Sequence, residues 1–135
     1  MRLFLSLAVF TVFSVCIPEI SQGTYVGSFQ EGEAAVIFGK ASWYAEFSRG
    51  IKKTTANMEK FDHDKMTCAI WDVPFNTKLK VTNLTNNKSV VVRVNDRGPN
   101  RRFYGRVIDL TKAAFSQIED LDKGLVDVKI EILNV

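Results

Sequence analysis

The run from residue 90 to residue 99, Val-Val-Val-Arg-Val-Asn-Asp-Arg-Gly-Pro, constrains the fold more than any other stretch of the chain. Four of its first five residues are valines, whose branched side chains favour a β-strand. The strand must end where Gly98 and Pro99 turn the chain. Asp96 and Arg97 therefore stand at the end of a stiff strand, which suits a site built on a rigid element. The alternative is an ordinary turn with two solvated charges.

A second strand pairs with this one in a predicted hairpin. Residues 77–84 alternate between two faces of a strand. Apolar residues, followed by Asn83, lie on one face, and lysines and a threonine lie on the other. Residues 85–88 read Thr-Asn-Asn-Lys, and asparagine tolerates the positive φ of a tight turn. Residues 89–95 then return along the first strand, so the two runs form one β-hairpin.

The remaining elements are short and mostly extended. Gly39 indicates a bulge or a close backbone approach, residues 45–65 form a long polar loop of the kind that is often functional, and Asp109 or Thr111 is expected to cap the helix. Six strands in one domain of 135 residues predict a closed barrel, which leaves no exposed sheet edge. The expected strands span residues 35–44, 66–71, 77–84, 89–95, 107–110 and 125–133, and the helix spans 112–118.

The N-terminus differs from the rest of the chain. Arg2 precedes a mostly apolar run over residues 3–15, which is typical of a secretory signal and short for a membrane span of about 20 residues. We therefore predict a signal peptide and lead-in over residues 1–23, a linker over 24–34 and the barrel domain over 35–135. A buried first helix is the alternative.

The two cysteines have different expected roles. Cys16 closes the apolar run, where a bacterial lipoprotein carries its lipidated cysteine, although Val15 fits that signal poorly and simple cleavage is the alternative. Cys68 lies among apolar residues and is expected to be buried. No zinc-type spacing is present, so we expect neither a metal nor another cofactor. A net charge of +3 does not indicate nucleic-acid binding and is compatible with an anionic polymer.

Seven blocks of the sequence carry a resemblance. They are Gly-Lys-Ala-Ser-Trp-Tyr at 39–44, Thr-Ala-Asn-Met-Glu at 55–59, Phe-Asp at 61–62, Pro-Phe-Asn-Thr at 74–77, Val-Thr-Asn-Leu at 81–84, Val-Arg-Val-Asn-Asp-Arg-Gly-Pro at 92–99 and Ile-Asp-Leu-Thr at 108–111. In this order they resemble the rare lipoprotein A family over about residues 38–133, and seven ordered blocks are far more specific than one motif.

The resemblance implies a mainly β fold, a six-stranded double-psi β-barrel with one or two short helices, similar to the barrels of expansins and related endoglucanases. It also implies an exported bacterial envelope protein of the periplasm or cell wall. The implied activity is that of an endolytic lytic transglycosylase, which cleaves peptidoglycan glycan strands and prefers strands without stem peptides.

The resemblance also assigns acidic cleft residues. Glu59, Asp62 and Asp96 match the family's positions, and Asp96 is expected to act first as general acid and then as base. Asp62 or Glu59 is expected to influence Asp96 as a like charge or to polarise the sugar. The family's histidine falls on Ile70, whose side chain neither donates, accepts nor carries charge.

Other residues are candidates for substrate binding. Trp43 and Tyr44 are expected either to stack on sugar rings or to join the barrel core. Arg97 binds substrate, pairs with a carboxylate or braces its loop. Arg101 either lines a cleft for anionic wall polymer or is solvated. His63 either replaces the missing imidazole or is a solvated loop residue.

Three functions remain open at this point. The first is the transglycosylase, and the second is a non-catalytic wall-binding or septal scaffold, which Ile70 favours. The chain also departs from the family at two glycines, which are replaced by Ala45 and Met58. The third is a hydrolase, which requires a second carboxylate acting through water. The expected partners are glycan strands and division or septal envelope proteins. We expect a monomer whose membrane contact is limited to a lipid on Cys16.

Overall fold

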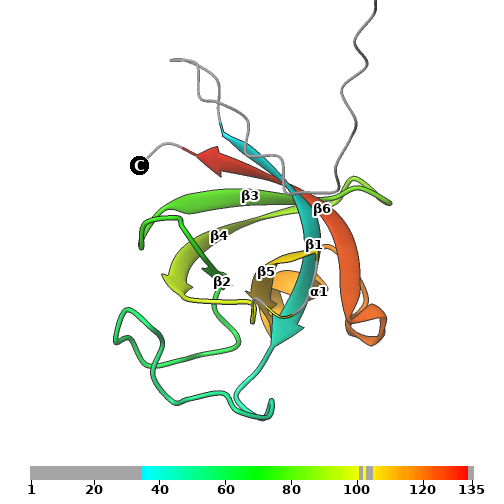
Figure 1. Ribbon diagram of the computed structural model, residues 1–135. Helices are drawn as coiled ribbons and strands as arrows, with labels where there is room; N and C mark the ends of the chain where they lie inside the picture. Colours follow the sequence, from blue (N-terminus) through cyan, green and yellow to red (C-terminus); the bar gives the residue numbers. More distant parts are fainter. Residues whose placement is uncertain (1–34, 101, 103–104, 134–135) are drawn as a thin grey trace, which may run out of the picture.

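The computed structural model describes residues 35–100, 102 and 105–133, which form a closed barrel of six strands (Figure 1). Around the barrel the order is β1-β5-β2-β4-β3-β6. The predicted mainly β, six-stranded barrel is therefore confirmed, whereas the predicted signal segment, the linker and Cys16 lie outside the described residues. The strands are β1 (Val36–Tyr44), β2 (Thr67–Ile70), β3 (Lys78–Asn83), β4 (Ser89–Asp96), β5 (Arg106–Thr111) and β6 (Leu125–Leu133).

Two short helical segments separate β5 from β6. The helix α1 (Lys112–Ser116) ends before residue 118, where its predicted end lay, and the 3₁₀ helix η1 (Leu121–Lys123) occupies a segment predicted as loop. Asp120 caps η1 by accepting a hydrogen bond from the Asp122 amide at 3.1 Å, and such a cap favours a helical turn. Within the described part of the chain, no helix is long and apolar enough to cross a membrane.

Thr111 caps α1, which decides between the two capping residues expected from the sequence. Its hydroxyl accepts a hydrogen bond from the Ala114 amide at 3.4 Å and donates one to the Lys65 carbonyl at 2.6 Å. The cap therefore also holds the end of the long loop between β1 and β2. Asp109 makes different contacts, which belong to the site described below.

Two of the six strand pairings are parallel, and each contains a bulge. β1 pairs with β5 and shifts register between Lys40 and Ala41, and β2 pairs with β4 and shifts between Cys68 and Ala69. A β-carbon at Gly39 would lie 2.5 and 2.7 Å from the two methyl carbons of Val107. The bulge or close approach predicted at Gly39 is thus confirmed, because the glycine lets β1 touch β5.

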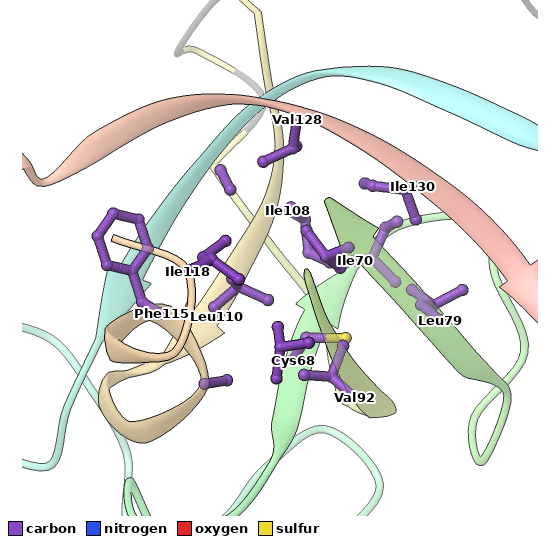
Figure 2. Close-up of a cluster of buried hydrophobic side chains, with 14 of the residues drawn as sticks. Cys68, Ile70, Leu79, Val92, Ile108, Leu110, Phe115, Ile118, Val128 and Ile130 are labelled. Carbon is purple, nitrogen blue, oxygen red and sulfur yellow. The ribbon is translucent and has the colours of Figure 1, made fainter. Parts of the chain in front are cut away.

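The inward-facing side chains fill the barrel. Alternate residues of the strands, among them Leu79, Val92 and Ile130, are almost fully buried, and Figure 2 shows them inside the barrel together with Cys68. Cys68 is a buried free thiol, as predicted. Phe115 of α1 joins the same cluster, so the helix packs on the barrel core.

Asn83 lies at the inward end of β3 and is fully buried. Its amide nitrogen donates to the Ile118 carbonyl at 3.0 Å and to a Glu119 carboxylate oxygen at 3.1 Å. Its carbonyl oxygen accepts from the Thr85 amide at 2.9 Å. Because a buried amide without partners is costly, these bonds explain how a polar residue occupies an inward position and why it fixes the hairpin to the end of α1.

A second, smaller apolar cluster lies under the long loop between β1 and β2, which projects from the barrel in Figure 1. Tyr44 and Phe61 stack with ring centroids 4.8 Å apart, and Ala69 and Ile51 pack beside them. Burial of these apolar residues offsets part of the conformational entropy that is lost when a loop without helices is ordered. This cluster therefore anchors the loop beside the end of β4.

We predict that Gly39→Ala lowers the free energy of unfolding by about 1–3 kcal/mol, because the new methyl group overlaps Val107 and overpacking costs roughly that much. Urea denaturation measures the change. In a Val107→Ala background, which removes both clashing carbons, the same substitution should cost distinctly less. An equal cost in both backgrounds would show that the close approach to Val107 is not the reason for the glycine.

Candidate active site at the barrel rim

Asp96 is the last residue of β4, and its half-buried carboxylate is held from one side. Oδ1 accepts hydrogen bonds from the backbone amides of Arg97 at 2.8 Å and Ala56 at 2.9 Å. Oδ2 lies 3.5 Å from the hydroxyl of Tyr44. Two backbone donors fix the orientation of the carboxyl group, so Oδ2 is the oxygen left to exchange a proton.

Tyr44 supplies the second contact to this carboxyl group. It ends β1, is 6% exposed and stacks on Phe61. Burial, and secondarily the negative charge of Asp96, raises the pKa of the Tyr44 hydroxyl. The hydroxyl therefore stays neutral and acts as a hydrogen-bond donor. Tyr44 is buried, but in the smaller cluster under the long loop and not in the barrel core that the sequence suggested as its alternative.

Glu59 lies in a dense set of hydrogen bonds. Both its oxygens accept from the Arg93 guanidinium, each at 2.8 Å. The amide nitrogens of Asn57 and Asn95 donate at 2.8 and 3.2 Å. Arg93 foremost, with Asn57 and Asn95, lowers the pKa of Glu59 to about 2. Glu59 is consequently an ionised carboxylate at neutral pH and not a proton donor.

The Glu59–Arg93 pair also positions Asp96. Glu59 belongs to a narrow loop closed by a bridge between Thr54 and Lys60, and Arg93 belongs to β4. The pair ties this loop to the strand that ends in Asp96. The same loop carries the Ala56 amide that holds Oδ1 of Asp96, so Glu59 acts on the carboxyl group through the backbone.

Asp62 and His63 lie elsewhere in the long loop. Asp62 accepts a hydrogen bond from the Asp64 amide at 3.0 Å. The His63 imidazole accepts from the Glu46 amide at 3.3 Å, with its ring 5.8 Å from that of Phe47. Among the described residues, no hydrogen bond or ion pair joins Asp62 or His63 to Asp96. The structure thus gathers Asp96, Tyr44 and the Glu59 loop, and leaves these two residues outside that network.

A second carboxylate, Asp109, lies across β2 from Asp96. Ala69 of β2 is in register with Asp96 on one side and with Asp109 on the other. Neighbouring strands lie about 4.8 Å apart, so the two backbones are separated by about 10 Å. Asp109 accepts hydrogen bonds from Ser42 and, at 2.6 Å, from Arg106. The sequence suggested Asp109 as a helix cap, a role that Thr111 fills. Its place across β2 from Asp96 follows from the strand register, which the sequence pattern alone did not give.

Comparison with known proteins identifies the family. A profile described as lytic transglycolase matches residues 36–130. The chain belongs to this family. Residues 1–35 and 131–135 lie outside the match.

Named relatives agree with this assignment and with the predicted resemblance to rare lipoprotein A. The endolytic peptidoglycan transglycosylase RlpA of Campylobacter jejuni is 46% identical over 95 residues, covering 70% of this chain and 33% of its own length. The protein of the same name from Vibrio cholerae is 46% identical over 98 residues, covering 72% and 35%. The match spans about a third of these relatives.

Solved structures support the fold alone. A Streptomyces papain inhibitor superposes with a TM-score of 0.58 at 23% identity, covering 73% of this chain and 94% of its own. A Clavibacter michiganensis expansin superposes with a TM-score of 0.57 at 20% identity, covering 73% and 50%. This member of the lytic transglycolase family therefore has the double-psi β-barrel that the sequence resemblance implied.

Ile70 departs from the family pattern described above. Its side chain is 3% exposed and belongs to the main core cluster, and Figure 2 shows it beside Ile108 inside the barrel. Arg97 holds the backbone around it by donating to the carbonyls of Ile70 and Val73, each at 3.0 Å, while its guanidinium lies 3.7 Å from the centre of the Phe75 ring. Arg97 therefore braces its loop, one of the roles expected for it.

Trp43, the other aromatic candidate, shares no hydrogen bond with Asp96 or Tyr44 in the described part of the chain. Trp43 packs against the barrel core and donates from its ring nitrogen to the Leu121 carbonyl at 3.1 Å. Adjacent residues of a strand face opposite sides, so Trp43 points away from the side that Tyr44 faces. Arg101 lies outside the described residues.

We predict that Glu59→Gln lowers the free energy of unfolding at pH 7, because Arg93 loses its anionic partner. Since the pKa of Glu59 falls from 4.5 to about 2 on folding, the stabilisation is complete above about pH 4.5 and disappears as the pH falls towards 2. The gap between wild type and variant in urea denaturation should shrink over that window. Asp127→Asn, which removes an exposed ion pair with Lys40, is the control and should cost less than about 1 kcal/mol at pH 7. A gap that stays constant down to pH 2.5 would contradict this role of Glu59.

We also predict that Met58→Gly raises stability by about 0.5–1 kcal/mol. Met58 has a φ of 70° and is 82% exposed, so its side chain gains little burial while its β-carbon opposes the left-handed conformation. Met58→Ala keeps that β-carbon and should leave the urea midpoint nearly unchanged. Equal midpoints for the glycine and alanine variants would rule out backbone strain at this position.

Proposed function

We propose that this lytic transglycolase-family chain is an endolytic lytic transglycosylase acting on the β-1,4 glycosidic bonds of peptidoglycan glycan strands. It prefers strands without stem peptides and releases 1,6-anhydro ends. Because such strands lie outside the cytoplasm, the chain is exported to the bacterial envelope. The names of the relatives and the geometry around Asp96 support this proposal.

Asp96 carries the chemistry in this proposal. The protonated Oδ2 gives its proton to the bridging oxygen as the bond from that oxygen to the sugar C1 breaks and its electron pair passes to the oxygen. The 6-hydroxyl oxygen of the same sugar then bonds to C1, and its proton passes to Oδ2. Asp96 regains its starting state and no water is consumed, so one carboxyl group serves as acid and then as base.

The single observation that supports this role is the asymmetry of the Asp96 carboxyl group. Oδ1 is fixed by the Ala56 and Arg97 amides, so the proton is exchanged at Oδ2. The neutral hydroxyl of Tyr44 lies on that side and donates a hydrogen bond to Oδ2 in the interval when the proton is on the sugar. Preorganised donors of this kind stabilise charge that develops during a reaction.

A second candidate is a non-catalytic barrel that binds peptidoglycan or serves as a septal scaffold. Ile70 favours it, because an apolar buried residue occupies the position of the family's histidine.

A hydrolase is the third function to consider. In a hydrolase, Asp109 would have to act through water as the second carboxylate, but its Oδ1 accepts hydrogen bonds from Arg106 and Ser42. The products distinguish these functions, since a transglycosylase leaves anhydro ends and a hydrolase leaves reducing ends.

We predict that Asp96→Asn lowers the rate of anhydro-product formation at least about 100-fold, the usual minimum for losing a general acid. The asparagine oxygen still accepts from the two backbone amides, so the fold is retained. The assay is digestion of amidase-treated sacculi followed by mass spectrometry, and Asp127→Asn on the barrel exterior is the control. Wild type that gives no anhydro product at any dose, while still sedimenting with sacculi, would exclude the transglycosylase and support the scaffold.

A further inference from the structure

A groove of about 410 Å³ opens in the long loop beside the site. Lys53 and Lys60 line it from the two legs of the narrow loop, which are held together by the Thr54–Lys60 bridge and by a 2.9 Å hydrogen bond from the Phe61 amide to the Lys53 carbonyl. The full lining is Glu46, Ile51, Lys52, Lys53, Lys60 and Phe61. Three lysines therefore line one concave surface.

The positive charge of the groove is largely uncompensated. In the described part of the chain, Lys52, Lys53 and Lys60 form no ion pair, whereas two arginines of the neighbouring site do, Arg93 with Glu59 and Arg106 with Asp109. The one acidic group in the lining, Glu46, has a carboxylate oxygen 3.9 Å from the His63 imidazole. Like charges that converge in a concavity raise the local concentration of anions.

Two buried, stacked rings link the groove to the proposed acid. Phe61 lines it and stacks on Tyr44 at 4.8 Å, and the hydroxyl of Tyr44 reaches Asp96. Ile51 adds apolar surface to the lining. The same long loop also carries the Ala56 amide that holds Asp96. An apolar floor with a cationic rim on this loop suits a sugar ring that carries an acidic substituent.

We propose that this lysine groove, lined by Lys52, Lys53 and Lys60, binds the free lactyl carboxylate of a muramic acid residue next to the bond that is cleaved. The inference rests on the proposed function and gives its strand preference a physical cause. In a strand without stem peptides each lactyl group ends in a carboxylate. An attached peptide converts that carboxylate to a neutral amide, which removes the charge that the lysines attract.

The test measures binding separately from catalysis. Asp96→Asn, which still folds if its amide contacts persist, is titrated with peptide-free glycan strands and with the same strands after carbodiimide coupling to methylamine. We expect the methylamide strands to bind about 10-fold more weakly at low salt. Adding Lys52→Gln, Lys53→Gln and Lys60→Gln should weaken binding of the carboxylate strands to that same level and leave the methylamide strands unaffected.

A charge-matched variant provides the control. Lys78→Gln, Lys80→Gln and Lys88→Gln remove three exposed lysines from β3 and the hairpin turn and should retain the preference for carboxylate strands. In the active chain, the groove variant should raise KM for peptide-free strands with little change in kcat, because the lysines do not touch the reacting atoms.

Three results would overturn the assignment: equal binding of both strands by the Asp96→Asn chain, equal loss in the groove and control variants, or tighter binding of poly(glycerol phosphate) than of the glycan. The last would identify the anion as a polymer phosphate. Absence of anhydro products from the wild type, with the carboxylate preference intact, would instead reject the proposed catalysis and leave the groove assignment standing.

Discussion

The pair between Arg93 and Glu59 is the interaction on which the geometry of the site depends. It joins two segments that are far apart in the sequence, the end of β4 and the narrow loop over residues 54–60. Two parallel N–H···O bonds fix both distance and orientation, which a single contact would not. Together with the hydrogen bond from the Asn57 amide to the Asn95 carbonyl, the pair holds the loop against the strand where the Ala56 amide reaches Asp96. Glu59, which matches an acidic position of the family's cleft, thus contributes by positioning the loop that holds Asp96.

Barrel register makes a comparable contribution on the other side of Asp96. The bulge between Cys68 and Ala69 shifts β2 against β4, so Ala69 faces Asp96 while Cys68 still points into the core. A β-carbon at Gly98 would be 3.3 Å from both Ala69 and the Asp109 carboxylate, which shows how closely the turn after Asp96 packs on β2. Small residues at these two places let the rim approach the sheet, and the two carboxylates stand on either side of one alanine.

The sequence predicted the fold well because the strands alternate clearly and their ends carry turn residues. It also placed Asp96 at the end of a rigid strand. It could not predict the partner of Glu59, because the pairing joins loop and strand across 34 positions. Strand periodicity alone predicts that Trp43 and Tyr44 lie on opposite faces of β1. Only the closed barrel shows that Tyr44 is the one on the side of the site. The early end of α1 reflects tertiary packing, since Ile118 is buried without being helical.

Ile70 shows how stability and chemistry compete at one position. A fully buried isoleucine contributes roughly 1.5–3 kcal/mol through the hydrophobic effect, whereas an imidazole at the same place would need a hydrogen-bond partner to offset its burial. The chain therefore gains core stability where the family resemblance places a titratable group. In the proposed mechanism, Asp96, with Tyr44 as donor, is the group that moves a proton at the rim. A reaction in which one carboxyl group gives and then recovers the same proton requires no second titrating residue, so the apolar substitution is physically compatible with catalysis.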